Sequence, residues 1–549
     1  MASGETASEK QLNFVHYVPD VDLSLDALPA IDWREKRSLS VFQTRIAEEM
    51  SGCFCSELWS RFMLLVAMHE SAVRHAIIAL STLYEQYFDT LHGPHTGQSD
   101  FAIEHYVKAI QEVLRLNRSN EAQAIDVALL DCIVFSTLEA LQGHYQSAST
   151  HIRSGLHLLA EHDGDSAAVT QGVYVPRILF RQLFVRMETQ AREMGNFVVP
   201  SSPPKLNKCL RRMPHAFSSL AQATLAMSSY LNRLLLFLQD ADISTPSEGA
   251  TSEDLDQLVQ RRRLLVDGYY GYCDAFKGMS LTGIEKQSEV LILRLYTVFV
   301  GIILRVDLNA GEVGFDDFDQ DFQDVVMLAS QFISHSSVLI PNPQLPDDRT
   351  LLTVQMSTQN VSSTSSPSLF PPETLSGSSH IWLGIHPKAT PVCPPAEWQG
   401  TTQHVRLTDP RPLFPKPGTI YRPTYSMSLG VIAPLFATAV RCRNPIIRRQ
   451  ALQILLMCNR KEGLWDSIIS AKVAERVICI EETHLFEERQ DRCVGRIPEH
   501  ARIRQLEASF FDPRRGRLRY MKSGLCPCSI ARSDGADAAC EQYEELIAW

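Results

Sequence analysis

The chain has 549 residues, of which 45% are hydrophobic and 21% charged, and its formal net charge is −11. This composition is typical of a folded globular protein with room for two or three domains, or for one large helical body. The acidic balance argues against nucleic-acid binding over the whole surface, which would require a basic footprint.

Cysteine usage and hydropathy suggest an intracellular protein without a membrane segment. The 13 cysteines are scattered and odd in number, and their spacing does not resemble a disulfide framework. The polar N-terminus lacks the apolar core of a secretory signal. The longest apolar run, residues 290–306, is interrupted by Arg294 and Arg305. Because a membrane-spanning helix needs roughly 18 apolar residues, we expect a buried helix there.

The region from residue 36 to residue 335 carries the strongest helical pattern. Apolar residues recur there at spacings of three and four, as in Val73, Ile77 and Leu80, which predicts amphipathic helices that bury one face. We interpret residues 36–335 as one helical regulatory domain.

One part of this region predicts a tetratricopeptide-like helical hairpin. Two amphipathic helices, one ending at Gln142 and one beginning at Tyr145, join through Gly143. The small residues Ala148 and Gly155 would let neighbouring helices approach closely. The sequence lacks a 34-residue self-repeat, so an irregular array is predicted rather than a regular solenoid.

The flanking regions differ in composition. Residues 1–35 are expected to be an extended N-terminal arm, and residues 336–420, rich in Ser, Thr and Pro, a disordered linker or insertion. Residues 421–510 predict C-terminal helices packing on the main body, and residues 511–549 a basic then acidic tail that ends as helix or coil. Strand signals are weak throughout. The predicted fold is therefore all-α, an irregular multi-helix array with a long disordered insertion.

The histidine spacings do not predict a metal or catalytic site. His69, Glu70 and His75 lack the H-E-x-x-H spacing that places two ligands on one helix face, since position 73 is valine. A second histidine group also fails to share one face, because its members are six and five residues apart: His151, His157 and His162.

The cysteine pairs and the glycine-rich motifs give the same result. Cys53 and Cys55, like Cys526 and Cys528, are separated by one residue, which is poor geometry for a zinc site. The sequence has no G-x-S-x-G, P-loop or G-x-G-x-x-G motif. We expect no catalytic residue, no metal and no cofactor.

Basic clusters are the one electrostatic signal in this acidic chain. From Arg489 to Lys522 there are ten Lys and Arg against four Asp and Glu, a local charge of +6 (10 − 4). Its densest part is a candidate nuclear-import or phosphate-contacting segment, and the alternative is a solvated surface helix and loop. The four arginines of this basic segment are Arg514, Arg515, Arg517 and Arg519. Smaller clusters are Arg261–Arg263 and the group Arg441, Arg443, Arg448 and Arg449.

Trp465 precedes a predicted helix whose apolar stripe it begins. Asp466 or Ser467 could cap that helix, because a side-chain oxygen there can accept a hydrogen bond from an unpaired backbone N–H. We interpret Trp465 as a core residue rather than a ligand contact.

Three stretches of the chain resemble the regulatory domain of the fungal binuclear zinc-cluster transcription factors. They are residues 40–87 with Trp59-Ser60-Arg61, residues 126–159 with Gly143, Tyr145 and Ala148, and residues 462–482. The resemblance implies an all-α, nuclear, transcription-related protein of a fungus, often a regulator of a small-molecule pathway. It also implies protein partners, in a homo- or heterodimer, and allows for a small-molecule effector bound between helices.

The DNA-reading module of that family has no counterpart in this sequence. The module needs six cysteines, including two C-x-x-C pairs, ahead of the helical region, whereas the first cysteine is Cys53. Direct DNA binding by this chain is therefore not expected. Such a chain could begin downstream of the module, act naturally through partners, or use the helical body for another role.

The leading hypothesis is a transcription-factor-like regulator of a secondary metabolic pathway that acts through protein contacts. The alternative is a non-DNA-binding enzyme or accessory protein of a secondary-metabolite biosynthetic pathway, built on the same helical body.

Overall fold

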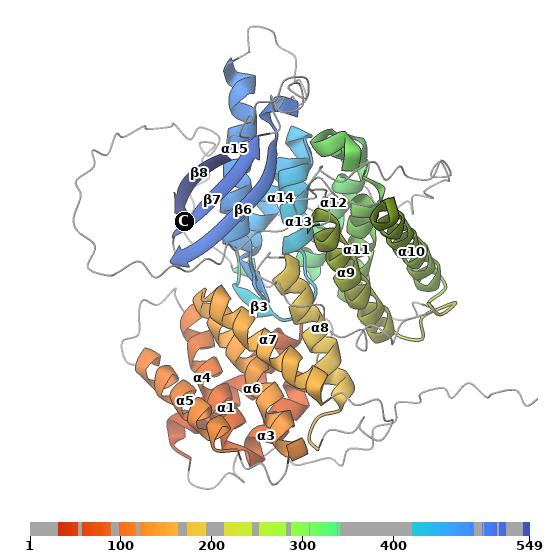
Figure 1. Ribbon diagram of the computed structural model, residues 1–549. Helices are drawn as coiled ribbons and strands as arrows, with labels where there is room; N and C mark the ends of the chain where they lie inside the picture. Colours follow the sequence, from red (N-terminus) through yellow and green to blue (C-terminus); the bar gives the residue numbers. More distant parts are fainter. Residues whose placement is uncertain are drawn as a thin grey trace, which may run out of the picture.

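A computed structural model describes residues 31–52, 57–88, 98–116, 121–162, 173–193, 213–243, 252–280, 287–306, 308–336, 339–340, 420–487, 497, 499–512, 515–522 and 542–548. Within these ranges most residues are helical, and the strands form three small sheets (Figure 1). The prediction of a mainly α-helical, irregular array is confirmed. None of the described helices combines the length and the hydropathy needed to cross a bilayer.

The N-terminal helices, drawn red to yellow in Figure 1, form one end of the molecule. Two short π-helical segments, η2 (Phe42–Ile46) and η3 (Leu58–Phe62), continue into α2 and α3. The helices are α1 (Trp33–Val41), α2 (Ala47–Ser51), α3 (Met63–His69), α4 (Ser71–Phe88), α5 (Gln98–Leu114), α6 (Glu121–Gln142), α7 (Tyr145–Glu161) and α8 (Arg177–Glu193). Phe42 and Trp59 pack ring to ring in their core and are fully buried.

The predicted hairpin is α6 and α7, which pack against each other around the turn at Gly143. Ala148 is fully buried. A Cβ atom at Gly155 would overlap the ring of Phe184 on α8, so glycine allows α8 to lie directly on α7. The close helix approach predicted at Gly155 is confirmed.

A second group of helices follows, coloured green in Figure 1: α9 (Leu220–Ile243), α10 (Ser252–Lys277), α11 (Gln287–Arg305) and α12 (Asp319–Ser336), with the 3₁₀-helix η9 (Leu308–Phe318) before α12. The long apolar run forms α11, whose Ile292, Leu295 and Val300 are fully buried, as predicted. The acidic residues around 309–323 lie in η9 and in the first turn of α12, where carboxylates suit the positive helix N-terminus.

The C-terminal helices α13 (Ile432–Arg441), α14 (Pro445–Cys458) and α15 (Ser467–Glu487) pack on one another and on α12. Short strands accompany them: β1 (Leu339–Ile340) pairs antiparallel with β2 (Ile420–Tyr421), and β3 (Thr424–Ser426), β4 (Arg460–Glu462) and β5 (Trp465–Asp466) form a second sheet in the order β3-β4-β5.

This second sheet joins the N-terminal helices to the rest of the molecule, and we call it the joint sheet. The Lys461 ammonium donates to the carbonyl of Leu141 at 3.1 Å, and the Met427 N–H donates to the carbonyl of Met50 at 3.2 Å. The joint sheet therefore connects to α6 through the Lys461 side chain, and the residue that follows β3 connects to α2 through a main-chain hydrogen bond.

The expectation of a helix or coil at the C-terminus is wrong, because the structure has strands there. After the 3₁₀ turn η10 (Glu499–Ala501), the strands β6 (Ile503–Asp512), β7 (Arg515–Lys522) and β8 (Gln542–Ala548) form an antiparallel sheet in the order β6-β7-β8. In β7, Gly516, Leu518 and Tyr520 are buried while Arg517 and Arg519 face outward. Buried and exposed residues thus alternate with the two-residue period of a strand. The pattern is difficult to recognise in the sequence, because most of the outward-facing residues are arginines and the stretch reads as a run of charges.

Two predicted segments fall mainly outside the described residues. Of the N-terminal arm at 1–35, the structure describes residues 31–35, and α1 already begins at Trp33. Of the predicted insertion at 336–420, it describes Ser336, the strand Leu339–Ile340 and Ile420.

Candidate functional site

Helix α5 exposes an apolar stripe to solvent. Ile103, Val107, Ile110 and Leu114 are separated by four, three and four residues, the spacing of the a and d positions of a coiled coil, and Leu114 is 81% exposed. The other face of α5 buries Ala102, His105 and Ala109 against α4. The helix is thus apolar on two sides, and the outer side has the pattern of a helix-binding surface.

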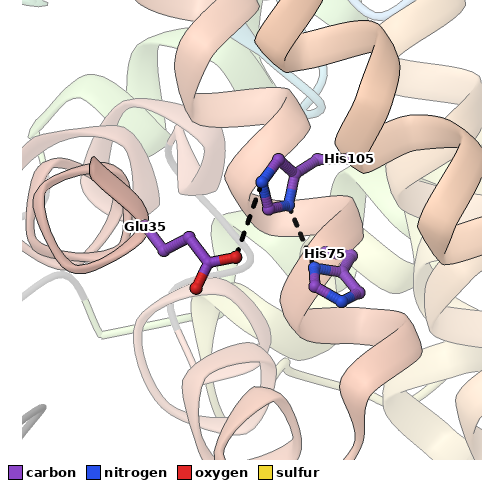
Figure 2. Close-up of side chains that lie close together, drawn as sticks. All are labelled: Glu35, His75 and His105. Atoms are coloured by element: carbon purple, nitrogen blue, oxygen red, sulfur yellow. Dashed lines mark hydrogen bonds and ion pairs between the residues drawn. The ribbon is translucent and has the colours of Figure 1, made fainter. Parts of the chain in front are cut away.

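Beneath α5, a carboxylate and two imidazoles from three helices lie in contact. His105 lies between Glu35 of α1 and His75 of α4 (Figure 2). Its Nδ1 atom is 3.0 Å from Nδ1 of His75, and its Nε2 atom is 3.6 Å from Oε1 of Glu35. One donor atom from each residue lies within 4.8 Å of the others. We call this group the histidine–glutamate cluster.

Burial favours the neutral form of the two imidazoles in this cluster. It lowers the pKa of His105 to about 4, together with the neighbouring His75 and Lys108, and it also lowers the pKa of His75. When both rings are neutral, the N–H at Nδ1 of His75 can donate to Nδ1 of His105. The proton of His105 is then on its Nε2 atom, which faces Glu35. That tautomer satisfies both contacts.

The Glu35 carboxylate is held in place by the N-terminus of its own helix. The Asp32 backbone N–H donates to Oε2 of Glu35 at 3.1 Å, as half of a capping box whose N-cap residue is Asp32. Because Oε2 is engaged there, Oε1 is directed toward the imidazoles.

The other histidines considered from the sequence do not join this cluster. His69 stacks on the ring of Tyr174, and Glu70 accepts a hydrogen bond from the Tyr174 hydroxyl at 2.6 Å. His151 approaches the Tyr106 hydroxyl, while His157 and His162 contact different glutamates. The cysteine pairs at 53/55 and 526/528 lie outside the described residues.

Most arginines of the smaller basic clusters are buried and hold the fold together. Arg441 and Arg443 both bind Glu312 of η9, and Arg443 and Arg448 both bind Glu481 of α15. Glu481 is buried, which raises the pKa of its carboxyl, but the two guanidinium groups outweigh burial and leave that pKa below its usual value. These buried ion pairs tie η9, α13, α14 and α15 together.

Other basic residues have the same structural role. Arg502 binds Asp316 of η9 with two hydrogen bonds of 2.9 and 2.8 Å and is itself buried. The buried Arg262 of α10 donates to the carbonyls of Leu304 and Val306 at the end of α11. These arginines are occupied within the chain, so they do not form a phosphate-binding surface.

The basic segment lies largely on β7. Arg515 is exposed, whereas Arg517 and Arg519 both pair with Glu544 of β8, at 3.1 and 2.8 Å. Arg514 lies outside the described residues. Strand pairing therefore brings the acidic end of the chain against its basic segment and compensates part of the positive charge.

Trp465 is a buried core residue, as predicted. Its ring packs on Phe436, and its indole N–H donates to Oε2 of Glu193 at 2.9 Å. Asp466 caps α15 by accepting from the backbone N–H groups of Ile468 and Ile469, which confirms the predicted cap.

Sequence patterns missed both the histidine–glutamate cluster and the exposed stripe. Glu35, His75 and His105 are separated by 40 and 30 residues, and only the crossing of α1, α4 and α5 brings them together. The spacing of the α5 stripe was visible, but an apolar stripe on one helix does not reveal whether it faces the core or the solvent.

Comparison with known proteins gives one relative that spans the chain. No family model matches the sequence, and no solved structure matches it. The chain is similar to the aspercryptin biosynthesis cluster-specific transcription regulator of Emericella nidulans, with 24% identity over 542 residues. The aligned region covers 94% of this chain and 86% of that regulator.

Proposed function

We propose that this protein is a fungal transcription regulator that controls a secondary-metabolite gene cluster. The observation that carries the proposal is the similarity to a cluster-specific transcription regulator across 94% of the chain. The mainly α-helical array supports it, because this is the fold class that the resemblance to fungal regulatory domains implies. A regulator of this kind works in the nucleus.

We further propose that the regulator acts through protein contacts rather than by reading DNA itself. The α5 stripe supports this part, since four apolar side chains at coiled-coil spacing suit the apolar face of a partner helix. The charged pair Glu104 and Lys108, 2.7 Å apart, flanks the stripe and could set the orientation of that helix. The arginines at 441, 443, 448 and 502 are occupied by internal carboxylates, so they leave little basic surface for DNA.

The experiment is a tethering assay in a fungal host. The full chain is fused to an unrelated DNA-binding domain, and transcription of a reporter bearing the cognate DNA site is measured. The proposal predicts that the tethered chain changes reporter transcription, and that Val107→Asp abolishes the change by placing a charge in the α5 stripe.

A matched control separates a lost contact from a general effect of surface charge. Val259 of α10 is 45% exposed, as is Val107, but lies outside the stripe, so Val259→Asp should leave the reporter response intact. Equal responses of the two variants would contradict a role for the stripe. Light scattering on the purified chain then shows whether the partner helix belongs to a second copy.

A further inference from the structure

The histidine–glutamate cluster is a candidate for a function that neither the relative nor the sequence motifs assign. We infer that Glu35, His75 and His105 form a binding site for a divalent transition-metal ion, with Zn²⁺ the expected occupant. Bound metal would fasten α1 to the α4–α5 pair. This inference rests on geometry alone and is independent of the proposed function.

The donor set suits such an ion. Two imidazole nitrogens and one carboxylate oxygen are a known three-residue set for zinc, which takes water or another ligand in its fourth position. With metal–ligand bonds of about 2.0–2.1 Å, tetrahedral ligand atoms lie roughly 3.3 Å apart. The two Nδ1 atoms are already 3.0 Å apart, and the three donor atoms lie within 4.8 Å of one another. The two contacts use opposite nitrogens of His105, so an ion would turn that ring and displace the proton shared by the two Nδ1 atoms.

The surroundings of the cluster hold the ligands in place. The capping contact to Asp32 fixes one oxygen of Glu35 and leaves the other directed at the imidazoles. His105 is 1% exposed, and its ring packs on the ring of Phe101. Ordered ligands supported by neighbouring contacts are a requirement for tight metal binding.

The nearby positive charges are engaged elsewhere. Arg34 lies over the ring of Phe101, Arg74 donates to the carbonyl of Ala67, and Lys108 pairs with Glu104. Glu104 and Glu112 add negative charge on α5.

The first experiment titrates the chelator-treated full chain with Co²⁺, whose spectrum distinguishes nitrogen and oxygen ligands from cysteine thiolates. We expect one equivalent of Co²⁺ to bind and to give d–d absorption bands without a thiolate-to-cobalt charge-transfer band. Added Zn²⁺ should displace the Co²⁺. Glu35→Gln keeps an acceptor for the Asp32 N–H but removes the anionic ligand. This variant and His75→Gln should each weaken binding by more than about 10-fold.

The matched control is His151→Gln, a change of another partly buried histidine that should leave affinity unchanged. Unchanged Co²⁺ affinity in both Glu35→Gln and His75→Gln would overturn the inference, as would binding through thiolates alone. In either case the cluster would be only a hydrogen-bonded chain.

A second readout tests the fastening of α1. Zn²⁺ should slow amide hydrogen exchange in residues 33–41 of the unmodified chain and not in Glu35→Gln. Glu85 ties α4 to α1 through Arg37 at 2.7 Å without belonging to the cluster. Glu85→Gln should therefore speed amide exchange in α1 of the metal-free protein, but Zn²⁺ should still slow it. If Zn²⁺ no longer slowed exchange in Glu85→Gln, the proposal that the metal holds α1 independently of the Arg37–Glu85 pair would be contradicted.

Discussion

The buried carboxyl of Glu193 shows how one residue can make stability depend on pH. Burial, opposed by the indole N–H of Trp465 and reinforced by the charge of Glu462, raises the pKa of Glu193 to about 7. A carboxyl with a raised pKa favours folding when it is protonated. Its contribution is fully present below the unfolded pKa of about 4.3 and is lost as pH rises through about 7.

Glu193→Gln should remove this dependence while keeping an oxygen acceptor for Trp465. We expect the variant to be more stable than the unmodified chain at pH 8, by roughly 2–4 kcal/mol, and the difference to shrink toward pH 5. Urea unfolding at several pH values measures it. Glu161→Gln, at an exposed site on α7, is the control. A difference between Glu193→Gln and the unmodified chain that stays constant with pH would contradict the assignment.

The buried carboxylate of Glu481 is a second determinant at the residue scale. It accepts from Arg443 and Arg448 and from the backbone N–H of Ile503 at the start of β6. Glu481→Gln leaves two buried guanidinium groups short of a counter-charge. Breaking such a buried pair costs roughly 3–5 kcal/mol.

The test compares Glu481→Gln with Glu475→Gln on the same helix. Glu475 pairs with Lys472 at the surface, and an exposed pair contributes about 0–1 kcal/mol. We expect a large loss of urea resistance for Glu481→Gln and almost none for Glu475→Gln. Similar small losses in both variants would show that the buried pairs are not needed to hold α15 and β6.

At the scale of elements, the joint sheet depends on a glycine turn. Gly463, between β4 and β5, has φ of +59°, and a Cβ atom there would overlap the amide of Gln190 on α8. Gly143, between α6 and α7, also has a positive φ, of +83°, but a Cβ atom there meets no heavy atom within 4 Å. A side chain at Gly143 would therefore cause backbone strain alone, whereas a side chain at Gly463 would cause backbone strain and also collide with α8.

Alanine substitution at each position tests this difference. Gly143→Ala should cost about 1–2 kcal/mol, the usual penalty for a left-handed residue. Gly463→Ala should exceed that by roughly 1–3 kcal/mol, the cost of overpacking, and should speed hydrogen exchange in α8. Equal costs measured by urea unfolding would mean that the contact between the joint sheet and α8 relaxes freely.

The local elements could largely be predicted from the sequence, and their contacts could not. Apolar spacing predicted the α6–α7 hairpin, and a side-chain oxygen before an apolar stripe predicted a cap at Asp466 or Ser467, of which the structure shows Asp466. The clustered arginines pointed to a surface because arginine is usually exposed. Arg443 and Arg448 are instead buried against Glu481, which is more than 30 residues away. Pairings over such separations depend on helix crossings that local patterns do not record.

Strand β7 is the clearest error at this scale, and it changes how the basic segment is interpreted. The expected surface loop or helix is a strand whose Arg517 and Arg519 share Glu544. A nuclear-import receptor would have to compete with these ion pairs. The role of the basic segment in import stays a prediction.

At the scale of the whole molecule, the central claim is that this helical body regulates transcription of a secondary-metabolite gene cluster. The evidence is similarity to one such regulator over nearly the whole chain, with an exposed helix face suited to a partner. An enzyme or accessory protein built on the same body would affect the metabolite without affecting the transcripts of the cluster.

The measurement that separates these roles most directly is transcript sequencing in the source fungus after deletion of the gene. The account predicts that transcripts of one contiguous biosynthetic cluster fall or rise together, and that the unmodified gene restores them. Loss of a metabolite with every cluster transcript unchanged would contradict it and would favour the enzymatic or accessory role.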